Sequence, residues 1–382
     1  MIARILVTGA TGSVGAELVA VLARAGHAVT AVMHSNAAIV RPNGRRVPVS
    51  PLQSQPQPGR VSSIAGDICQ EHLGLGARDL DRLYACTDVI VHSAAATQFG
   101  LPDAVYEQVN VGGTRNVLGL AAGAPVGALP MVHVSTAYVC GNHDGSFHET
   151  DAASSGPFAN GYERTKAEAE RLVGAARRAG LRAATVRPSI VVGTESSGAV
   201  RDFRNIYTLL KVISEGRLTL IPGEYDATLD LVPVSYVAEL IANVAVRIDE
   251  VDGKTFHAVS GEPLTLRAIG EVAAEYPSFQ VPRFVPTSSF DIRDLDAFER
   301  RYYQRVVQPY ESYIARKTAF SNSQAVRFLG RAPAVRGKAL VRRLLDFCIR
   351  SRFLGDPLPG PAEFVTPRPA VGESARSQPV AI

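Results

Sequence analysis

The sequence has few cysteines and no pattern of metal-binding residues. Its 382 residues include four cysteines, Cys69, Cys86, Cys140 and Cys348. No two of them form a C-x-x-C pair, so the sequence suggests neither a zinc site nor a disulfide framework. The histidines His133, His143 and His148 lack the spacing of metal ligands and have no supporting cluster of acids. We therefore expect no metal site and interpret these histidines as structural.

The sequence also lacks long apolar runs and a strong net charge. No window reaches about 18 uninterrupted apolar residues, so a membrane span is not expected. The N-terminus opens on a short β-branched run, residues 2–7, and not on the charged and then apolar pattern of a secretory signal. The formal net charge of +4 is too small, and the Lys and Arg residues are too dispersed, to argue for nucleic-acid binding. These absences indicate a globular cytoplasmic protein.

What the sequence does contain is a strand, a turn, a helix and a second strand at its start. Residues 2–7 predict a strand, residues 16–26 have helical spacing and close on a glycine, and residues 28–33 predict the second strand. The further elements that we expect are strands at 61–66, 89–92, 131–135 and 183–188 and a helix at 109–122. Strands that alternate with helices at this spacing predict an α/β fold, a Rossmann-type doubly wound parallel sheet.

The rest of the chain divides by composition. Residues 1–260 form the expected Rossmann domain, into which segments of a substrate lobe are interleaved after about residue 190. Residues 36–62, approximately, have too many prolines and too few apolar side chains for regular structure, and predict an exposed insertion. Residues 261–354 are assigned to a smaller C-terminal substrate lobe. Residues 355–382, rich in proline, serine and charge, are expected to be disordered.

A glycine fingerprint occupies the first strand-to-helix turn. In Thr8-Gly-Ala-Thr-Gly-Ser-Val-Gly15, Gly9 permits a tight bend, Gly12 lets the backbone approach a pyrophosphate, and Gly15 allows close packing of helix on strand. The N-terminus of the following helix adds N–H groups and a dipole that favour phosphate. The context of strand, turn and helix favours a dinucleotide site over a structural turn without a ligand.

The end of the second strand bears on the choice between NADP and NAD. It reads Met33-His34-Ser35-Asn36 and has no Asp or Glu, whose carboxylate would bind a ribose 2′-hydroxyl and repel a 2′-phosphate. NADP is therefore favoured, with NAD as the alternative. The candidate partners of the 2′-phosphate are Ser35, Asn36, Arg41 and Arg45. His34 is either a phosphate ligand or a wall beside the adenine. Asp67 follows the third strand and either accepts from the adenine amino group or caps a helix.

The catalytic candidates are a tyrosine and a lysine on one helix. Tyr162 and Lys166 lie one turn apart on the same helix face. An ammonium beside a phenol is expected to lower the pKa of the phenol, which suits Tyr162 to proton exchange with a carbonyl or alcohol oxygen. Lys166 can also hold the nicotinamide ribose. In isolation, the same Tyr-x-x-x-Lys string is more often a solvated helix face.

Two further polar positions belong to the predicted site. Thr136 ends a strand and is placed to hydrogen-bond the same oxygen as Tyr162. Its neighbour Ser135 is the other candidate, but adjacent strand residues face opposite ways, so only one of them points into the cleft. Asn110 opens an apolar helix, either as its N-cap or as a residue that orients Lys166 through water.

Together these segments resemble the extended short-chain dehydrogenase/reductase superfamily over roughly residues 1–260. The motifs that carry the resemblance are the glycine turn, His92-Ser93-Ala94-Ala95, Asn110-Val-Gly-Gly-Thr114, Val134-Ser-Thr-Ala-Tyr-Val139 and Tyr162-x-x-x-Lys166. The superfamily implies a Ser/Thr–Tyr–Lys triad, whose hydroxyl position falls on Thr136. The catalytic residues expected are Thr136, Tyr162, Lys166 and Asn110. The cofactor-binding residues expected are Gly9, Thr11, Gly12, Ser13, Val14, Gly15, His34, Ser35, Asp67, Ile68, Ser93, Ala94, Ala95, Tyr162, Lys166, Pro188, Ser189 and Ile190.

A narrower resemblance comes from two later segments. Arg187-Pro-Ser-Ile-Val-Val-Gly193 and residues 229–238 are similar to the thioester reductase and fatty acyl-CoA reductase (male sterility) branch, and weaker versions occur in sugar epimerases and hydroxysteroid dehydrogenases. The branch implies reduction of an acyl thioester, CoA- or carrier-bound, to an aldehyde with NADPH. The alternatives are a ketone reductase or alcohol dehydrogenase for a steroid- or polyketide-like ring, and a dinucleotide sensor without turnover. A homodimer is left open.

Overall fold

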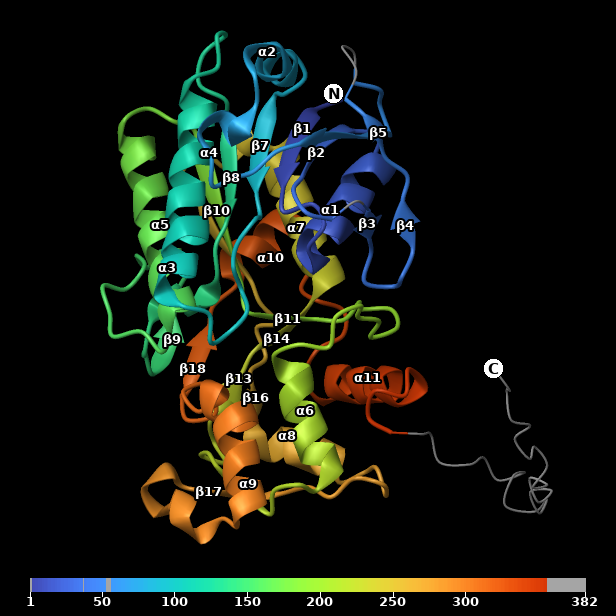
Figure 1. Ribbon diagram of the computed structural model, residues 1–382, viewed down its shortest axis with the longest axis vertical. Helices are drawn as coiled ribbons and strands as arrows, with labels where there is room; N and C mark the ends of the chain where they lie inside the picture. The colour runs from blue at the N-terminus through green and yellow to red at the C-terminus, as the bar shows by residue number, and fades with distance from the viewer. Residues whose placement is uncertain (1, 37, 53–55, 356–382) are drawn as a thin grey trace, which may run out of the picture.

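The computed structural model describes residues 2–36, 38–52 and 56–355. A Rossmann domain built on one large sheet lies above a smaller lobe, and the chain passes between the two more than once (Figure 1). The tail that was expected to be disordered lies outside the described residues, apart from Gly355.

The Rossmann domain contains an eight-stranded sheet whose neighbouring strands are all parallel. In sheet order the strands are β15 (Thr255–Ala258), β10 (Ala183–Pro188), β8 (Met131–Val134), β7 (Val89–His92), β1 (Arg4–Thr8), β2 (Ala28–Met33), β6 (Val61–Ala65) and β5 (Ser50–Pro51). The chain winds outward from β1 in one direction through β2 and in the other through β7. This order confirms the doubly wound α/β fold, and it places the ligand cleft at the carboxyl ends of β1 and β7.

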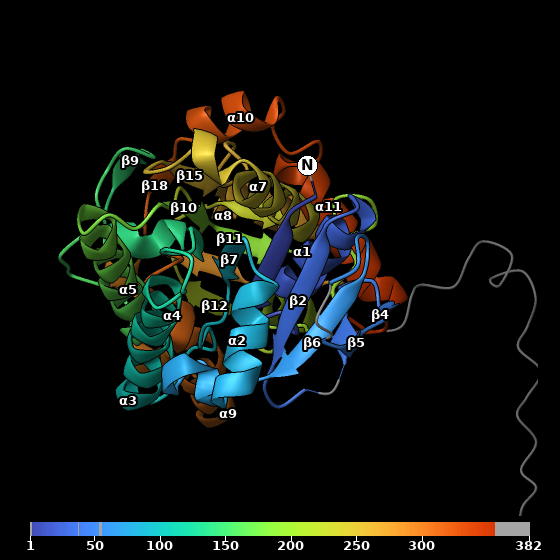
Figure 2. The ribbon, with the colours of Figure 1, turned by 90° about the horizontal axis from the view of Figure 1, so that it is seen from above.

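Helices cover both faces of the sheet (Figure 2). On one face lie α1 (Ser13–Arg24) and α7 (Val234–Val246), and on the other lie α2 (Ala77–Ala85), α4 (Gly113–Ala122) and α5 (Gly161–Arg178). Ile5 and Val7 of β1 pack in the core under α1 and α7, whereas Leu6 between them packs under α2 and α4. A strand that is buried on both faces needs apolar side chains at every position, which is why β1 shows no polar alternation.

The helix expected at 109–122 begins earlier than the sequence predicted. Its axis starts at α3 (Asp103–Tyr106), continues through a π-helical turn (Glu107–Gly112) and ends as α4. Asn110 therefore lies inside a continuous helix and is not an N-cap. Wide turns of this kind are often found at functional sites.

The segment expected to be an irregular insertion contains short strands. β3 (Ile39–Val40) pairs with β4 (Arg46–Val47), and β5 pairs with β6 at the edge of the main sheet. The absence of regular structure was predicted wrongly because Ile39 is fully buried against the α1 side of the core, and because Pro51 lies on an edge strand that needs no N–H donor. Most of the described residues from Asn43 to Pro51 are nevertheless exposed.

The smaller lobe is built from helices and short strand pairs. Its helices are α6 (Ile206–Glu215), α8 (Leu266–Ala273), α9 (Ala297–Tyr302) and α11 (Gly337–Arg350), and its strands are β12 (Leu220–Pro222), β13 (Thr228–Leu229), β16 (Leu264–Thr265) and β17 (Arg283–Val285). Leu340 and Leu344 of α11 pack with Ile269 and Val272 of α8 in a separate apolar core. The strands β11 (Ile190–Val192) and β14 (Leu231–Pro233) pair where the chain leaves and re-enters the Rossmann domain.

After the lobe the chain returns to the Rossmann domain. β18 (Thr318–Phe320) pairs with β9 (Gly145–Phe147), and α10 (Ser323–Leu329) packs on β15, with the rings of Phe328 and Phe256 5.0 Å apart. Part of the stretch 261–354 thus belongs to the larger domain. None of the helices in the described ranges is long and apolar enough to cross a membrane.

Candidate active site

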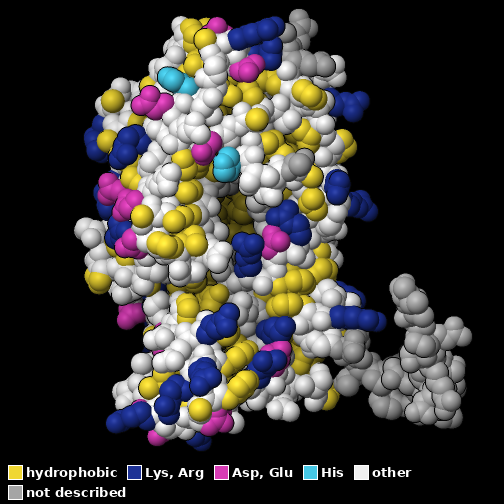
Figure 3. Space-filling view, viewed as in Figure 1, with side chains coloured by type: hydrophobic (Ala, Val, Ile, Leu, Met, Phe, Trp, Pro, Cys, Tyr) yellow, Lys and Arg dark blue, Asp and Glu magenta, His cyan; other side chains and the backbone are white. Residues whose placement is uncertain are grey.

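A cavity of about 670 Å³ lies between the Rossmann domain and the lobe, at the carboxyl ends of the sheet strands. It is visible as a hollow with an apolar floor at the centre of the molecule (Figure 3). The predicted site residues that line it are Gly9, Thr11, Gly12, Ser13, Val14, Gly15, His34, Asp67, Ile68, Ser93, Ala94, Ala95, Thr136, Tyr162, Lys166, Pro188, Ser189 and Ile190. Four residues that the sequence suggested, Ser35, Arg41, Arg45 and Asn110, are not part of the cavity wall.

The glycine turn has the form of a phosphate cradle. Gly9 has a φ of +71°, and a Cβ there would lie 2.6 Å from the Ala94 nitrogen. A Cβ on Gly15 would lie 2.1 Å from the Gly9 carbonyl oxygen, whereas Gly12 has open space beyond one contact of 3.3 Å. No side chain caps the first N–H groups of α1 at Gly12. These residues fit a dinucleotide, because the backbone is accessible at Gly12 and the helix start has free donors.

The end of β2 contributes polar groups to the same cavity. Asn36 Nδ2 donates to Thr11 Oγ1 over 3.3 Å, and His34 Nε2 lies 3.9 Å from Asp67 Oδ2. Ser35 is exposed and does not line the cavity. Asp67 accepts from the Cys69 N–H over 2.8 Å, and this bond lowers the pKa of its carboxyl. Asp67 therefore both caps a turn and faces the cavity, so its two predicted roles are compatible.

The two arginines that sequence reasoning offered to a 2′-phosphate are placed elsewhere. Arg41 donates to both carboxylate oxygens of Glu17 over 2.7 and 2.9 Å, and the two side chains are largely buried. A bidentate pair of this kind occupies the guanidinium. Arg45 is exposed at the end of the β3–β4 turn and does not line the cavity.

Tyr162, Lys166 and Thr136 meet at one end of the cavity. Lys166 Nζ is buried and donates to the Val134 carbonyl over 2.7 Å. The Thr136 side chain hydrogen-bonds the Tyr162 phenol and also lies 3.3 Å from the Pro188 carbonyl oxygen. Ser135 also lines the cavity, but its hydroxyl donates to Glu170 Oε2 over 2.7 Å. The alternation of the strand end therefore gives Thr136, and not Ser135, to Tyr162.

The protonation behaviour of this pair differs from the prediction. Burial raises the pKa of Tyr162 to about 12, against the opposing effect of the hydrogen bond from Thr136. Burial lowers the pKa of Lys166 to about 8, against the opposing effect of Glu170. The expected lowering of the phenol pKa by Lys166 does not occur, because the amine is directed to the Val134 carbonyl and desolvation of the phenol dominates. The Tyr162 phenol therefore stays protonated at neutral pH.

Asn110 supports the site from behind the cavity wall. Its side chain accepts from the Ala96 N–H over 2.8 Å and donates to Thr165 Oγ1 over 3.0 Å. It makes no direct contact with Lys166, whose amine is bonded to Val134. Asn110 thus joins the segment after β7, at Ala96, to the helix that carries Tyr162.

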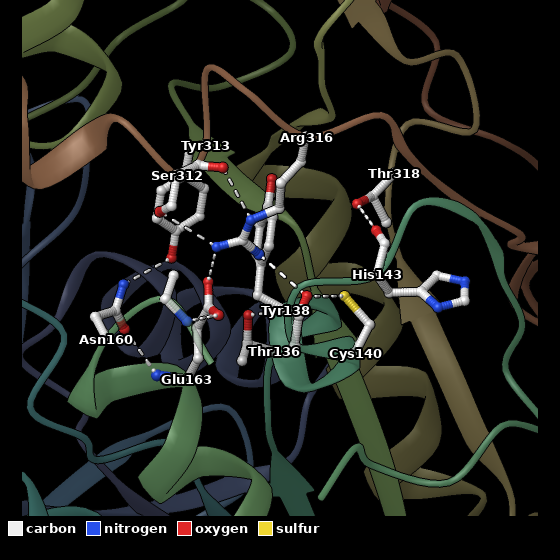
Figure 4. A network of polar contacts seen from close by, with 12 residues as sticks. Thr136, Tyr138, Cys140, His143, Asn160, Glu163, Ser312, Tyr313, Arg316 and Thr318 are labelled. Carbon is white, nitrogen blue, oxygen red and sulfur yellow. Dashed lines mark hydrogen bonds and ion pairs between the residues drawn. The ribbon is translucent and has the colours of Figure 1, made fainter. Parts of the chain in front are cut away.

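A buried ion pair fixes the start of α5 to the lobe (Figure 4). Arg316 Nη2 donates to Glu163 Oε1 over 2.8 Å, and the Arg316 and Glu163 side chains are only 7% and 0% exposed. The Asn160 side chain caps α5 at the Glu163 N–H and also donates to the Tyr313 hydroxyl over 3.3 Å. The Arg316 guanidinium lies over the rings of Tyr138 and Tyr313. The residue next to Tyr162 is therefore held by a segment of the lobe.

The lobe end of the cavity is aromatic. The Phe99 ring lies 6.4 Å from the Tyr162 ring, stacks on Tyr313 at 5.3 Å and lies 5.4 Å from Tyr310. Sequence reasoning missed Phe99, Tyr310 and Tyr313 because they lie in turns and in a three-residue 3₁₀ helix, which carry no periodic pattern. Tyr138, which also lines the cavity, lies within the Val134–Val139 motif.

The apolar face of α6 has a mixed role. Ile206, Tyr207 and Leu209 line the cavity, while Leu210 and Ile213 pack only in the lobe core. Helical spacing of apolar residues is typical of a plain core face, whereas here part of the face also borders the cavity. Among the residues that the structure describes, no group of three or more His, Cys, Asp or Glu side chains is arranged to hold a metal ion.

A doubly wound sheet whose glycine turn shares one cavity with a Tyr-x-x-x-Lys pair defines the extended short-chain dehydrogenase/reductases, a class of NAD(P)-dependent oxidoreductases. Within this class, the sequence profile of the male sterility protein family matches residues 7–241. The chain belongs to that family.

Two curated proteins and one solved structure are compared with the chain here. It is 28% identical over 270 residues to a component of the linear gramicidin synthase of Brevibacillus parabrevis, covering 67% of this chain and 5% of that protein. It is 27% identical over 274 residues to the probable fatty acyl-CoA reductase 4 of Arabidopsis thaliana, covering 57% and 55%. The crystal structure of the terminal R domain from the myxalamid PKS-NRPS pathway shares the fold, with a TM-score of 0.77, 24% identity and coverage of 94% and 93%. The chain thus spans about half or less of these two curated relatives.

Proposed function

We propose that the protein is an NADPH-dependent reductase that converts an acyl thioester, bound to CoA or to a carrier protein, into an aldehyde. The observation that carries this proposal is the convergence of Thr136, Tyr162 and Lys166 with the glycine turn on one cavity, in which aromatic side chains lie beside Tyr162. The similarity to a fatty acyl-CoA reductase and the fold of a terminal R domain support the choice of a thioester.

The chain's own residues supply the acid and the oxyanion contacts. A bound nicotinamide would supply the hydride, and Ser93, Ala94, Pro188 and Ser189 would surround it. Tyr162 donates a hydrogen bond, and then its proton, to the carbonyl oxygen of the substrate, and Thr136 offers a second hydrogen bond. Reduction of the thioester carbon gives a hemithioacetal. Its C–S bond then breaks, which releases a thiol and leaves the aldehyde.

The rate is expected to fall as the pH rises through about 8. Lys166 is a cation below its pKa of about 8 and neutral above it, and a cation in this cavity favours the negative charge that develops on the substrate oxygen as hydride arrives. Tyr162 stays protonated across this range because its pKa is about 12. Steady-state kcat measured from pH 6 to 10 should show a single decrease centred at a pH of about 8. In Lys166→Arg this decrease should occur at a higher pH. A flat wild-type profile would contradict the role of the cation.

Thiol release separates the proposal from its competitor. With NADPH and an acyl-CoA or acyl-pantetheine, free thiol and oxidised cofactor should appear in equal amounts. Oxidation of NADPH with a ketone and no thiol from any thioester would instead identify the ketone reductase. If neither substrate consumes NADPH although the cofactor binds, the dinucleotide-sensing function becomes the better description.

A further inference from the structure

Arg201 is a lobe-side residue that reaches into the cofactor end of the cavity. It lies between β11 and α6, and its guanidinium donates to the Thr11 carbonyl over 3.2 Å and to the Val40 carbonyl over 2.7 Å. Thr11 belongs to the glycine turn, 190 positions earlier in the chain. The guanidinium therefore joins the glycine turn and β3 to the loop that enters the lobe.

The groups around this guanidinium are those that border the adenosine ribose in a Rossmann fold. Thr11, His34, Asn36 and Pro42 line the same cavity as Arg201, and Asn36 is bonded to Thr11. The glycine turn and the end of the second strand are where such folds distinguish a 2′-phosphate from a 2′-hydroxyl. The backbone carbonyls bonded to Arg201 do not neutralise its charge.

Arg201 and Arg204 both line the cavity, and of these two it is Arg201 that is bonded to the glycine turn. Arg41 is occupied by Glu17, and Arg45 lies outside the cavity. Arg201 forms an ion pair with Asp202 Oδ2 at 2.7 Å, and Asp202 is itself partly exposed and lines the cavity. A phosphate dianion would compete with this single carboxylate, and a guanidinium can bind phosphate oxygens through two N–H groups at once.

We propose that Arg201 selects NADP(H) over NAD(H) by pairing with the 2′-phosphate, and that this pairing holds the loop between β11 and α6 against the glycine turn. The inference rests on the proposed use of NADPH. Because Arg201 lies on the lobe side of the cavity, the choice between NADP(H) and NAD(H) would be linked to the ordering of the loop that enters the lobe.

The test is equilibrium binding of NADPH, NADH and 2′,5′-ADP to the whole protein, without an acyl substrate. Arg201→Ala should weaken NADPH and 2′,5′-ADP about 10–100-fold, the effect of losing charge-assisted hydrogen bonds, and change NADH less than about twofold. Arg201→Lys, which keeps a point charge but not the planar fork, should give an intermediate loss. Arg45 is a surface arginine on the neighbouring β3–β4 hairpin and provides the matched control. Arg45→Ala should leave the affinities for NADPH, NADH and 2′,5′-ADP unchanged.

Three outcomes would overturn the assignment. Equal weakening of NADPH and NADH by Arg201→Ala would mean that the residue holds the loop or the pyrophosphate but does not read the 2′-phosphate. An equal loss of selectivity in Arg45→Ala or in Arg204→Ala, an exposed arginine that also lines the cavity, would move the role to that residue. Wild-type protein that binds NADH as tightly as NADPH would remove the selectivity itself. None of these results depends on thiol release, so failure of the thioester assay alone leaves the assignment standing.

Discussion

Replacing Tyr162 by phenylalanine is expected to lower kcat by about 10²–10⁴-fold, the usual contribution of a positioned general acid. The substitution keeps the aromatic ring beside Phe99, 6.4 Å away, and removes only the hydroxyl that Thr136 hydrogen-bonds. The cradle formed by the glycine turn is untouched, so NADPH affinity should be retained. Single-turnover measurement of NADPH oxidation and thiol release, together with equilibrium NADPH binding, checks both parts.

Tyr310→Phe is the matched control for this substitution. Tyr310 lies in the same aromatic wall, 5.4 Å from Phe99, and loses the same atom, but it is not the tyrosine of the Tyr-x-x-x-Lys pair. Its variant should change kcat far less. Equal losses in the two variants would show that the wall and not the phenol of Tyr162 is responsible, and wild-type kcat in Tyr162→Phe would remove Tyr162 from the chemistry.

The part of the site that could be predicted from sequence is the part built by local rules. Helical spacing puts Tyr162 and Lys166 on one face, strand alternation separates Thr136 from Ser135, and the glycine turn needs only eight residues in register. The pKa of Tyr162 was predicted in the wrong direction, because desolvation depends on everything that packs over the phenol and not only on its helix neighbour. Local spacing carries no information about that packing.

The residues that sequence reasoning missed are joined by long-range contacts. Arg201 meets the glycine turn across 190 positions, and Arg316 meets Glu163 across 153. Both lie in loops, where neither helical nor strand period marks a buried side chain. Ile39 shows the same limit in the fold, since its burial against α1 outweighs the proline-rich composition around it. Such contacts depend on how the lobe packs on the Rossmann domain.

Arg316→Leu is expected to destabilise the protein by about 3–5 kcal/mol, because it leaves the Glu163 carboxylate buried without its partner. The two side chains are 7% and 0% exposed, and solvent has little access to compensate the charge. Glu163 lies in the first turn of α5 and adjoins Tyr162, so kcat should fall as well. Urea unfolding at pH 7 gives the change in free energy, and NADPH oxidation gives the change in kcat.

Two further variants test whether the uncompensated charge of Glu163 causes the loss of stability in Arg316→Leu. Adding Glu163→Gln to Arg316→Leu removes that charge, so the double variant should recover part of the stability lost by Arg316→Leu alone. Arg342→Leu breaks a pair with Glu275 of similar length, 2.6 Å, but with side chains 44% and 45% exposed, and should change stability by only about 0–1 kcal/mol. An Arg316→Leu protein as stable as Arg342→Leu would contradict the argument. If the double variant regains stability but not kcat, the Arg316–Glu163 pair positions Tyr162 in addition to stabilising the fold.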